Sequence, residues 1–342
     1  MSTQVVSHHD QVLEDVPFPL IGFAVADITP TLNETVTKLS EQVDFSTETC
    51  KRLIIYLNLL DYRANCDSAF CQELGSALCS LYFVELFKRI WKQYFNVDLF
   101  SPRVVRSALW YNLLMLSDVM TTLSHSSMVI CASIAKYKVD ADLVKYLGSE
   151  LVKIDIDKGD KTEGVLKLAI VASFIRILYN VIKVSAESRE TLRICQAVKM
   201  LHPVREYGDE LIAVLVLIVQ AFLITDEERE LISCSTDSLE FLLGILNSAM
   251  NCQESYRLSV TDVLEAMSKL AVNDTNKVRL VQAGSLPYFV QLLQPNRSEE
   301  ERKQAAHGLW ILRFKCREDI SREPGCAEGK PLDDIYADNG FL

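Results

Sequence analysis

An internal repeat in the C-terminal half is the sequence feature that most constrains the fold. The segment Ser285–Leu293 (SLPYFVQLL) has a counterpart in Ser238–Leu246 (SLEFLLGIL), forty-seven residues earlier. In the same way, Met267-Ser-Lys-Leu270 has a counterpart forty-two residues later, in Leu309-Trp-Ile-Leu312. A fixed period of this size is typical of a solenoid, in which each repeat buries its apolar face against its neighbours.

The spacing of apolar residues predicts that these repeats are helical. From Thr31 onward, Leu32, Val36, Leu39 and Val43 recur on one helical face, and Thr31 with Glu34 matches a capping box. The 342 residues include only 12 glycines and 9 prolines. Because strand-rich folds need many turn residues, this scarcity disfavours a sandwich or a barrel. We therefore expect an all-α protein.

The segment Asn276-Lys-Val-Arg-Leu280-Val-Gln-Ala-Gly284-Ser-Leu286-Pro287 carries a resemblance to a known family. It is similar to the turn between the first and second helices of an armadillo repeat, which has about 40 to 47 residues. The resemblance implies a right-handed superhelical α-solenoid of such repeats, with units of about 42 to 47 residues. Gly284 is the predicted turn residue, because a left-handed backbone conformation favours glycine. Asp237 occupies the corresponding position in the preceding repeat.

The patterns divide the chain into five parts, described here from the N-terminus. Pro17, Pro19 and Pro30 indicate an irregular arm in its first part. The polar stretch that begins at Asp155 indicates a surface loop, and the apolar pattern after Phe314 is incomplete. The predicted parts are an arm (1–30), divergent helical repeats (31–152), a polar loop (153–164), armadillo-like repeats (165–316) and an incomplete repeat or tail (317–342).

The resemblance implies a protein-binding function, because solenoids usually bind partners in a concave groove. In peptide-carrying armadillo proteins, an asparagine near the end of each third helix holds an extended ligand. Alignment of the third helices places Asn112, Asn180, Phe222, Lys269 and Ile311 at that position. The mixed residues disfavour a carrier of the nuclear-import type. The two asparagines fit equally well as hydrogen-bonding residues between helices.

A second interpretation concerns the C-terminal end of the array. Since the last repeat is incomplete, Leu309, Leu312 and Phe314 are predicted to form an apolar end face that is covered by the tail, self-associates or binds a partner. The alternative function is then that of a regulatory fragment of a larger armadillo-containing signalling protein, such as one with a Toll/interleukin-receptor-type domain. By analogy with enzyme complexes, such an end could also inhibit or template a catalytic subunit.

The sequence predicts neither catalysis nor a bound cofactor or metal. The five histidines lie at no motif spacing from a cysteine or a carboxylate, and no phosphate-loop or zinc motif occurs. The Asp155 stretch lacks the calcium-loop glycine and glutamate at the required positions. His8 and His9 are expected to be solvated, and His307 to be structural or solvent-facing. Cys316, between Lys315 and Arg317, is the one thiol for which a lowered pKa is conceivable.

Charge and cysteine usage indicate where the protein acts. A net charge of -11 disfavours nucleic-acid binding. Ten cysteines without a C-x-x-C pair, and a polar N-terminus, favour the cytoplasm, with the nucleus as an alternative. The most apolar run, Leu211–Ile224, is shorter than the ~20 residues of a membrane span and is predicted to be a buried helix. We expect a protein partner.

Overall fold

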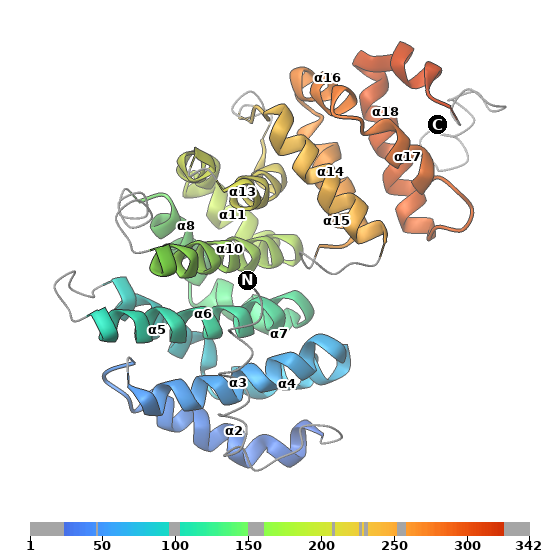
Figure 1. Cartoon of the computed structure of the whole chain (residues 1–342). Coiled ribbons are helices and arrows are strands. Elements are labelled where there is room, and N and C mark those ends of the chain that lie inside the picture. Colours follow the sequence, from blue (N-terminus) through green and yellow to red (C-terminus); the bar gives the residue numbers. More distant parts are fainter. Residues whose placement is uncertain are drawn as a thin grey trace. The chain divides into compact units, whose positions relative to one another are not determined.

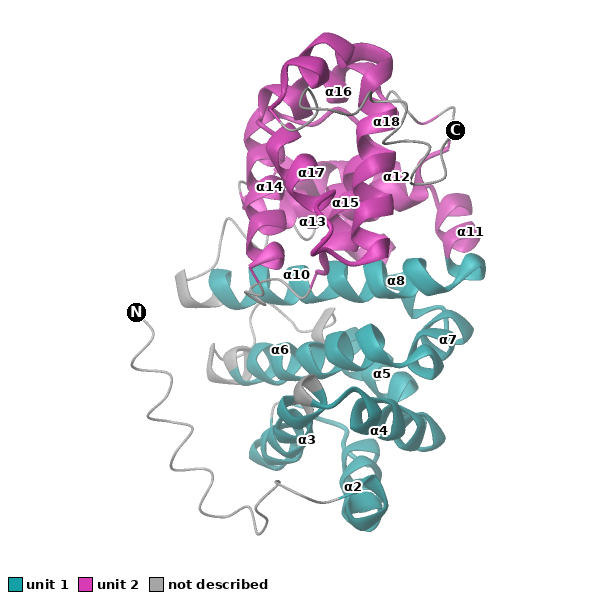
Figure 2. Ribbon diagram, turned by 90° about the vertical axis from the view of Figure 1, so that its right-hand side faces the viewer, with its two compact units in different colours: residues 1–143, 154–188 teal, residues 144–153, 189–342 magenta. Residues whose placement is uncertain are grey.

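The computed structural model describes residues 24–45, 47–95, 103–149, 161–206, 209–225, 228, 232–251 and 258–324. All regular secondary structure in these ranges is helical. The chain forms two compact units, which Figure 2 shows in different colours. Unit 1 comprises residues 1–143 and 154–188, and unit 2 comprises residues 144–153 and 189–342.

Figure 1 shows the helices in their order along the chain. In the part of the chain up to residue 188 they are α2 (Val25–Ser40), α3 (Glu48–Cys66), α4 (Ser68–Ser80), α5 (Phe83–Phe95), α6 (Arg103–Ser126), α7 (Met128–Lys136), α8 (Val139–Leu147) and α10 (Lys161–Val184). They are followed by α11 (Ala186–Ile194), α12 (Ala197–Leu201), the 3-10 helix η2 (His202–Glu206), α13 (Glu210–Leu223), α14 (Thr236–Met250), α15 (Val260–Leu270), α16 (Asp274–Gln282), α17 (Leu286–Leu292) and α18 (Glu299–Arg322).

Short polar side chains determine where many of these helices begin. Each such residue accepts a hydrogen bond from a backbone N–H of the first turn, which has no partner within the helix. The residues that do so are Thr47, Asp67, Asp209, Ser235, Ser259, Asn273 and Ser298.

Long third helices stack on one another within each unit. In unit 1, α6 packs between α3 and α10, and in unit 2, α15 packs between α13 and α18. The contacts are mainly apolar, with several hydrogen bonds between polar groups of α6 and α10. Phe174 and Leu116, for example, are fully buried in unit 1, and Leu264 and Leu309 are fully buried in unit 2. Each third helix thus buries its apolar side against its neighbours, as the repeat pattern predicts.

A single residue with a left-handed backbone marks the corner between the first two helices of several repeats. It is Tyr82 (φ 58°) between α4 and α5, Lys138 (φ 52°) between α7 and α8, Gln196 (φ 55°) between α11 and α12, and Gly284 (φ 87°) between α16 and α17. These corners define four repeats with the same order of helices: α4–α5–α6, α7–α8–α10, α11–α12–α13 and α16–α17–α18. The predicted all-α, armadillo-like repeat fold is confirmed, and the repeats extend into the N-terminal third.

Gly284 has the predicted role. The N–H of Ser285 donates to the carbonyl of Leu280 (3.1 Å), and the N–H of Gly284 donates to that of Val281 (3.0 Å). This is the Schellman pattern, which requires a left-handed residue after the helix. The corresponding prediction for Asp237 was wrong. Asp237 lies in the first turn of α14, where its carboxylate suits the positive end of the helix dipole.

Several element boundaries differ from the predicted ones. Helix α2, the first in the described residues, begins at Val25, before Thr31, and includes Pro30. At its start, the carboxylate of Asp27 accepts a hydrogen bond from the N–H of Ala24 (2.9 Å). Helix α10 begins at Lys161, within the predicted loop. Helix α18 continues past a kink at Cys316 to Arg322. The remainder of the predicted arm, loop and tail, with His8 and His9, lies outside the described residues.

Two apolar helices occupy the interior. In α13, every residue from Ile212 to Leu223 is buried, which confirms the prediction for this run. In α10, the segment Gly164–Val184 is long and apolar enough to span a membrane, but 72% of its most apolar window is buried in the structure. Helix α10 packs against α6 and α7 in unit 1, so its apolar character has a structural explanation.

Candidate functional site: the third-helix face of unit 2

The structure brings together two of the predicted groove residues. Phe222 and Lys269 each precede the last residue of a third helix, in α13 and α15 respectively. The Lys269 ammonium lies 5.1 Å from the centroid of the Phe222 ring, and 3.5 Å from Oε1 of Glu265. The side chains of Lys269 and Glu265 are each 39% exposed. A cation held over an aromatic ring in this way contributes about 0.5–1 kcal/mol, and it fixes the position of the charge.

A row of aromatic side chains runs along one face of α18. His307, Trp310 and Phe314 have the spacing that places residues on the same helical face. The rings of His307 and Trp310 stack with their centroids 6.4 Å apart, and the Trp310 and Phe314 rings meet edge to face at 4.9 Å. Phe314 is 64% exposed, while His307, Trp310 and the predicted Ile311 are half-buried. The row therefore presents apolar surface to solvent.

An electrostatic interaction connects the α18 row to the Lys269 pair. Burial lowers the pKa of His307, the positive charge of Lys269 lowers it further, and Glu265 acts in the opposite direction. These effects together favour the neutral form of the imidazole. We call Phe222, Glu265, Lys269, His307, Trp310 and Phe314 together the third-helix face, since they come from α13, α15 and α18.

The three residues predicted to form the apolar end face differ in their exposure. Leu309 and Leu312 are buried, because they lie on the side of α18 that packs against α15, α16 and α17. Phe314 alone among the three is exposed. The incomplete repeat pattern did not indicate that these leucines belong to the core of the last complete repeat.

The side-chain amides of Asn112 and Asn180 contact groups of neighbouring segments. Nδ2 of Asn112, on α6, donates to the carbonyl of Phe45 (2.7 Å). Nδ2 of Asn180, on α10, donates to the carbonyl of Thr121 (3.2 Å) and to Oγ of Ser124 (3.0 Å). Both side chains are buried in unit 1. The sequence allowed two roles for these asparagines, ligand binding and hydrogen bonding between helices. The contacts match hydrogen bonding between neighbouring segments.

Two functional candidates escaped the sequence reasoning. The alignment of asparagine positions at the ends of the third helices included neither Trp310 nor Glu265. The spacing of Trp310 from His307 and Phe314 could nevertheless be read from the sequence. Cys316 does not have the lowered thiol pKa that its neighbouring cations made conceivable. Its side chain is buried, and burial raises the pKa of the thiol above its ordinary value, which outweighs the neighbouring cations.

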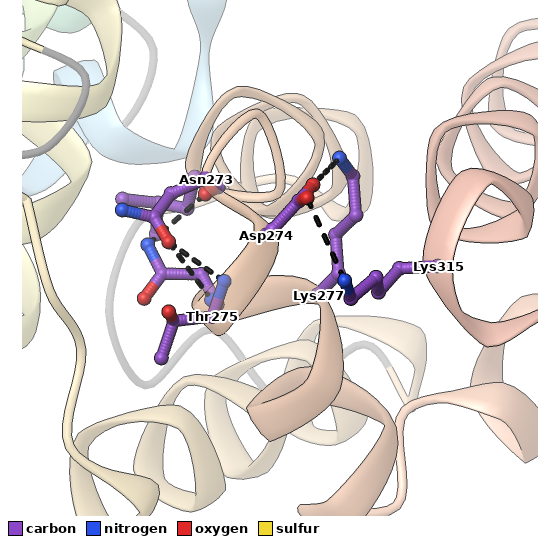
Figure 3. A network of polar contacts seen from close by, with 7 residues as sticks. Asn273, Asp274, Thr275, Lys277 and Lys315 are labelled. Carbon is purple, nitrogen blue, oxygen red and sulfur yellow. Dashed lines mark hydrogen bonds and ion pairs between the residues drawn. The ribbon is translucent and has the colours of Figure 1, made fainter.

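Polar contacts among residues of α16 and α18 form a network at the protein surface (Figure 3). Asn273 caps α16, and the carboxylate of Asp274 accepts a hydrogen bond from Nζ of Lys277 (2.6 Å). Nζ of Lys315, on α18, lies 4.0 Å from the other oxygen of Asp274. The hydrogen bond and charge of Lys277 lower the pKa of Asp274. The network joins the start of α16 to α18.

In the described part of the chain, no group of three histidine, cysteine or carboxylate side chains could hold a metal.

The helix order, the left-handed corners and the stacked third helices define an armadillo-like helical repeat fold. No protein-family model matches the sequence, and neither does any curated protein. Among solved structures, the chain is similar to an engineered protein (16% identity, 83% of this chain and 97% of that chain, TM-score 0.47) and to a designed armadillo repeat protein (14% identity, 82% and 99%, TM-score 0.43). The fold assignment rests on the helices and turns described above.

Proposed function

We propose that the protein is a non-catalytic interaction scaffold, and that the third-helix face binds an extended segment of a protein partner. The observation that carries this proposal is the partly exposed row of aromatic rings on α18, beside the Phe222–Lys269 pair. The proposed partner is met in the cytoplasm or the nucleus. Seven cysteines whose side chains the structure describes are free thiols, which suits a reducing compartment.

The composition of the face supports a peptide ligand. Tryptophan and other aromatic residues contribute most of the binding energy in many interfaces, because they bury a large apolar area at a low entropic cost. Trp310 and Phe314 offer such area, and the Glu265–Lys269 pair offers one charge of each sign beside it. An extended segment with an apolar anchor and polar neighbours matches this arrangement.

Selection from a library of random displayed peptides on the wild-type chain tests the proposal. Peptides recovered in this way should bind the double variant Trp310→Ala, Phe314→Ala at least about tenfold more weakly by fluorescence polarisation, as loss of an aromatic hot spot does. Tyr62→Ala is the control, because Tyr62 is a 76% exposed aromatic side chain in unit 1. Circular dichroism checks the fold of each variant. Equal affinity for the double variant and the wild type would exclude the face as the binding site.

The 64% exposure of Phe314 also favours a second candidate function, association through the C-terminal end of α18. This is the behaviour expected of a fragment that regulates a larger signalling protein. Light scattering at increasing concentration separates the two functions. If the chain associates, and Phe314→Asp abolishes the association while Lys269→Glu does not, the result would support association through the C-terminal end of α18. A chain that stays monomeric at all concentrations would leave the third-helix face as the proposed site.

A further inference from the structure

Unit 1 contains a pocket where the end of α2 meets α5. Its volume is about 490 Å³, in the range of ligand pockets. The lining residues are Ser40, Tyr82, Glu85, Leu86, Lys88, Arg89 and Lys92. Three cations therefore face a single lining carboxylate, in a chain whose net charge is -11.

Two of the cations are held in place by groups behind them. Nζ of Lys88 donates to the carbonyl of Tyr137 (2.6 Å) and lies 2.9 Å from Oδ2 of Asp142. The guanidinium of Arg89 donates through one terminal nitrogen to the carbonyl of Ser40 (2.6 Å), at the negative end of α2, and lies 5.4 Å from the Phe45 ring. Such support orients a binding group before a ligand arrives.

Lys92 is the more accessible cation. Its side chain is 51% exposed, and its ammonium shares Asp142 with Lys88 at 3.4 Å. Although burial of Asp142 acts in the opposite direction, the hydrogen bonds and charges of these two lysines lower the pKa of its carboxyl group. A single carboxylate thus supports two ammonium groups.

The pocket also has an apolar side. The left-handed backbone at Tyr82 places this residue at the α4–α5 corner, where it is 65% exposed. Leu86 is buried one turn further along α5. An aromatic ring and an aliphatic side chain beside fixed cations suit a ligand that has both carboxylates and an apolar group.

We infer that this pocket binds an acidic peptide segment of a partner, with its carboxylates on Arg89 and Lys92 and an apolar side chain against Tyr82 and Leu86. The charge complementarity carries the choice of ligand. The rest of the chain repels a polyanion, so specific binding of an acidic peptide has to occur where cations predominate. The pocket is formed by second helices and their corners, and the proposal stands independently of the third-helix face.

Fluorescence polarisation with a labelled short peptide of alternating Glu and Leu, and with the matched Lys and Leu peptide, tests the inference. The acidic peptide should bind at ~50 mM salt and weaken steeply by ~300 mM, because exposed ion pairs are screened. Lys92→Glu should weaken binding at least about tenfold, and Glu85→Gln should strengthen it about two- to threefold by removing the opposing charge. Lys303→Glu is the control, since Lys303 is similarly exposed (49%) and paired with Glu299 in unit 2.

Each result has a defined meaning. The opposite effects of the Lys92 and Glu85 variants, with an unchanged control, would support the inference. The inference is overturned if the acidic peptide does not bind, if Lys92→Glu binds it as the wild type does, or if the control weakens it equally. Inorganic phosphate is run in parallel. Binding of phosphate without binding of the peptide would overturn the inference in favour of a small-anion site.

Discussion

Asn276 donates a hydrogen bond from its side-chain amide to the main-chain carbonyl of Ile232 (2.8 Å), in the segment that precedes α14. The same amide nitrogen donates to the carbonyl of Leu270 (3.0 Å), and Oδ1 accepts from the N–H of Cys234 (3.0 Å). The side chain is fully buried. One residue near the start of α16 thus satisfies main-chain groups of two other segments of unit 2.

Replacement of Asn276 by alanine should therefore destabilise unit 2 by about 2–4 kcal/mol, because three hydrogen bonds are lost and buried main-chain groups remain unpaired. Urea denaturation followed by circular dichroism measures the loss. Asn247→Ala, at an exposed position of α14, should change stability by less than about 0.5 kcal/mol. Similar losses for the two variants would show that the buried amide has no special role.

The left-handed corners predict opposite effects of two reciprocal substitutions. Gly284→Ala should destabilise the protein by about 1–2 kcal/mol, because alanine is strained at φ 87° although its Cβ would meet no atom within 4 Å. Gln196→Gly should stabilise it by up to about 1 kcal/mol, since Gln196 is exposed and glycine relieves the strain at φ 55°. Urea midpoints that move in the same direction would contradict this account.

Asp140 should limit stability at neutral pH. Burial raises the pKa of this carboxyl group, although the N–H of Ala141 donates to Oδ1 (2.8 Å) and Ser188 lowers the pKa. A raised folded-state pKa means that the folded state holds its proton more tightly, so stability falls as the pH rises from the unfolded-state value. Asp140→Asn should stabilise the protein at pH 7 by roughly 1 kcal/mol. The gain should shrink toward pH 4 in urea melts, and a gain independent of pH would contradict the assignment.

The charges around His307 predict two shifts of opposite sign. Lys269→Met should raise the pKa of His307, and Glu265→Gln should lower it, as measured by NMR titration of the imidazole. Because the folded-state pKa lies below the ordinary value of 6.5, wild-type stability should also fall as the pH drops below that value. His307→Gln removes this dependence. An imidazole that titrates identically in the two charge variants would show that it does not sense the α15 pair.

The sequence predicted the helical repeat fold better than it predicted which residues form the third-helix face. The helical spacing and the Gly284 turn were visible because their physical causes lie in neighbouring residues. The roles of Asn112 and Asn180 depended on which main-chain carbonyl lay within reach, and only packing decides that. Phe222 and Lys269 were found because each lies at the same distance from the end of its helix. The N-terminal repeats could not be placed in register, since no glycine marks their corners.

The corners at Tyr82, Lys138 and Gln196 carry three chemically different side chains, all exposed, on one backbone conformation. Glycine would relieve about 1 kcal/mol of strain at each corner, but would leave it without a side chain. A non-glycine residue instead holds an aromatic ring, an ammonium or an amide at the same outward location of successive repeats. At these corners the backbone conformation is constant and the side chain varies. Related chains can therefore share this architecture and differ in the side chains that they display to their partners.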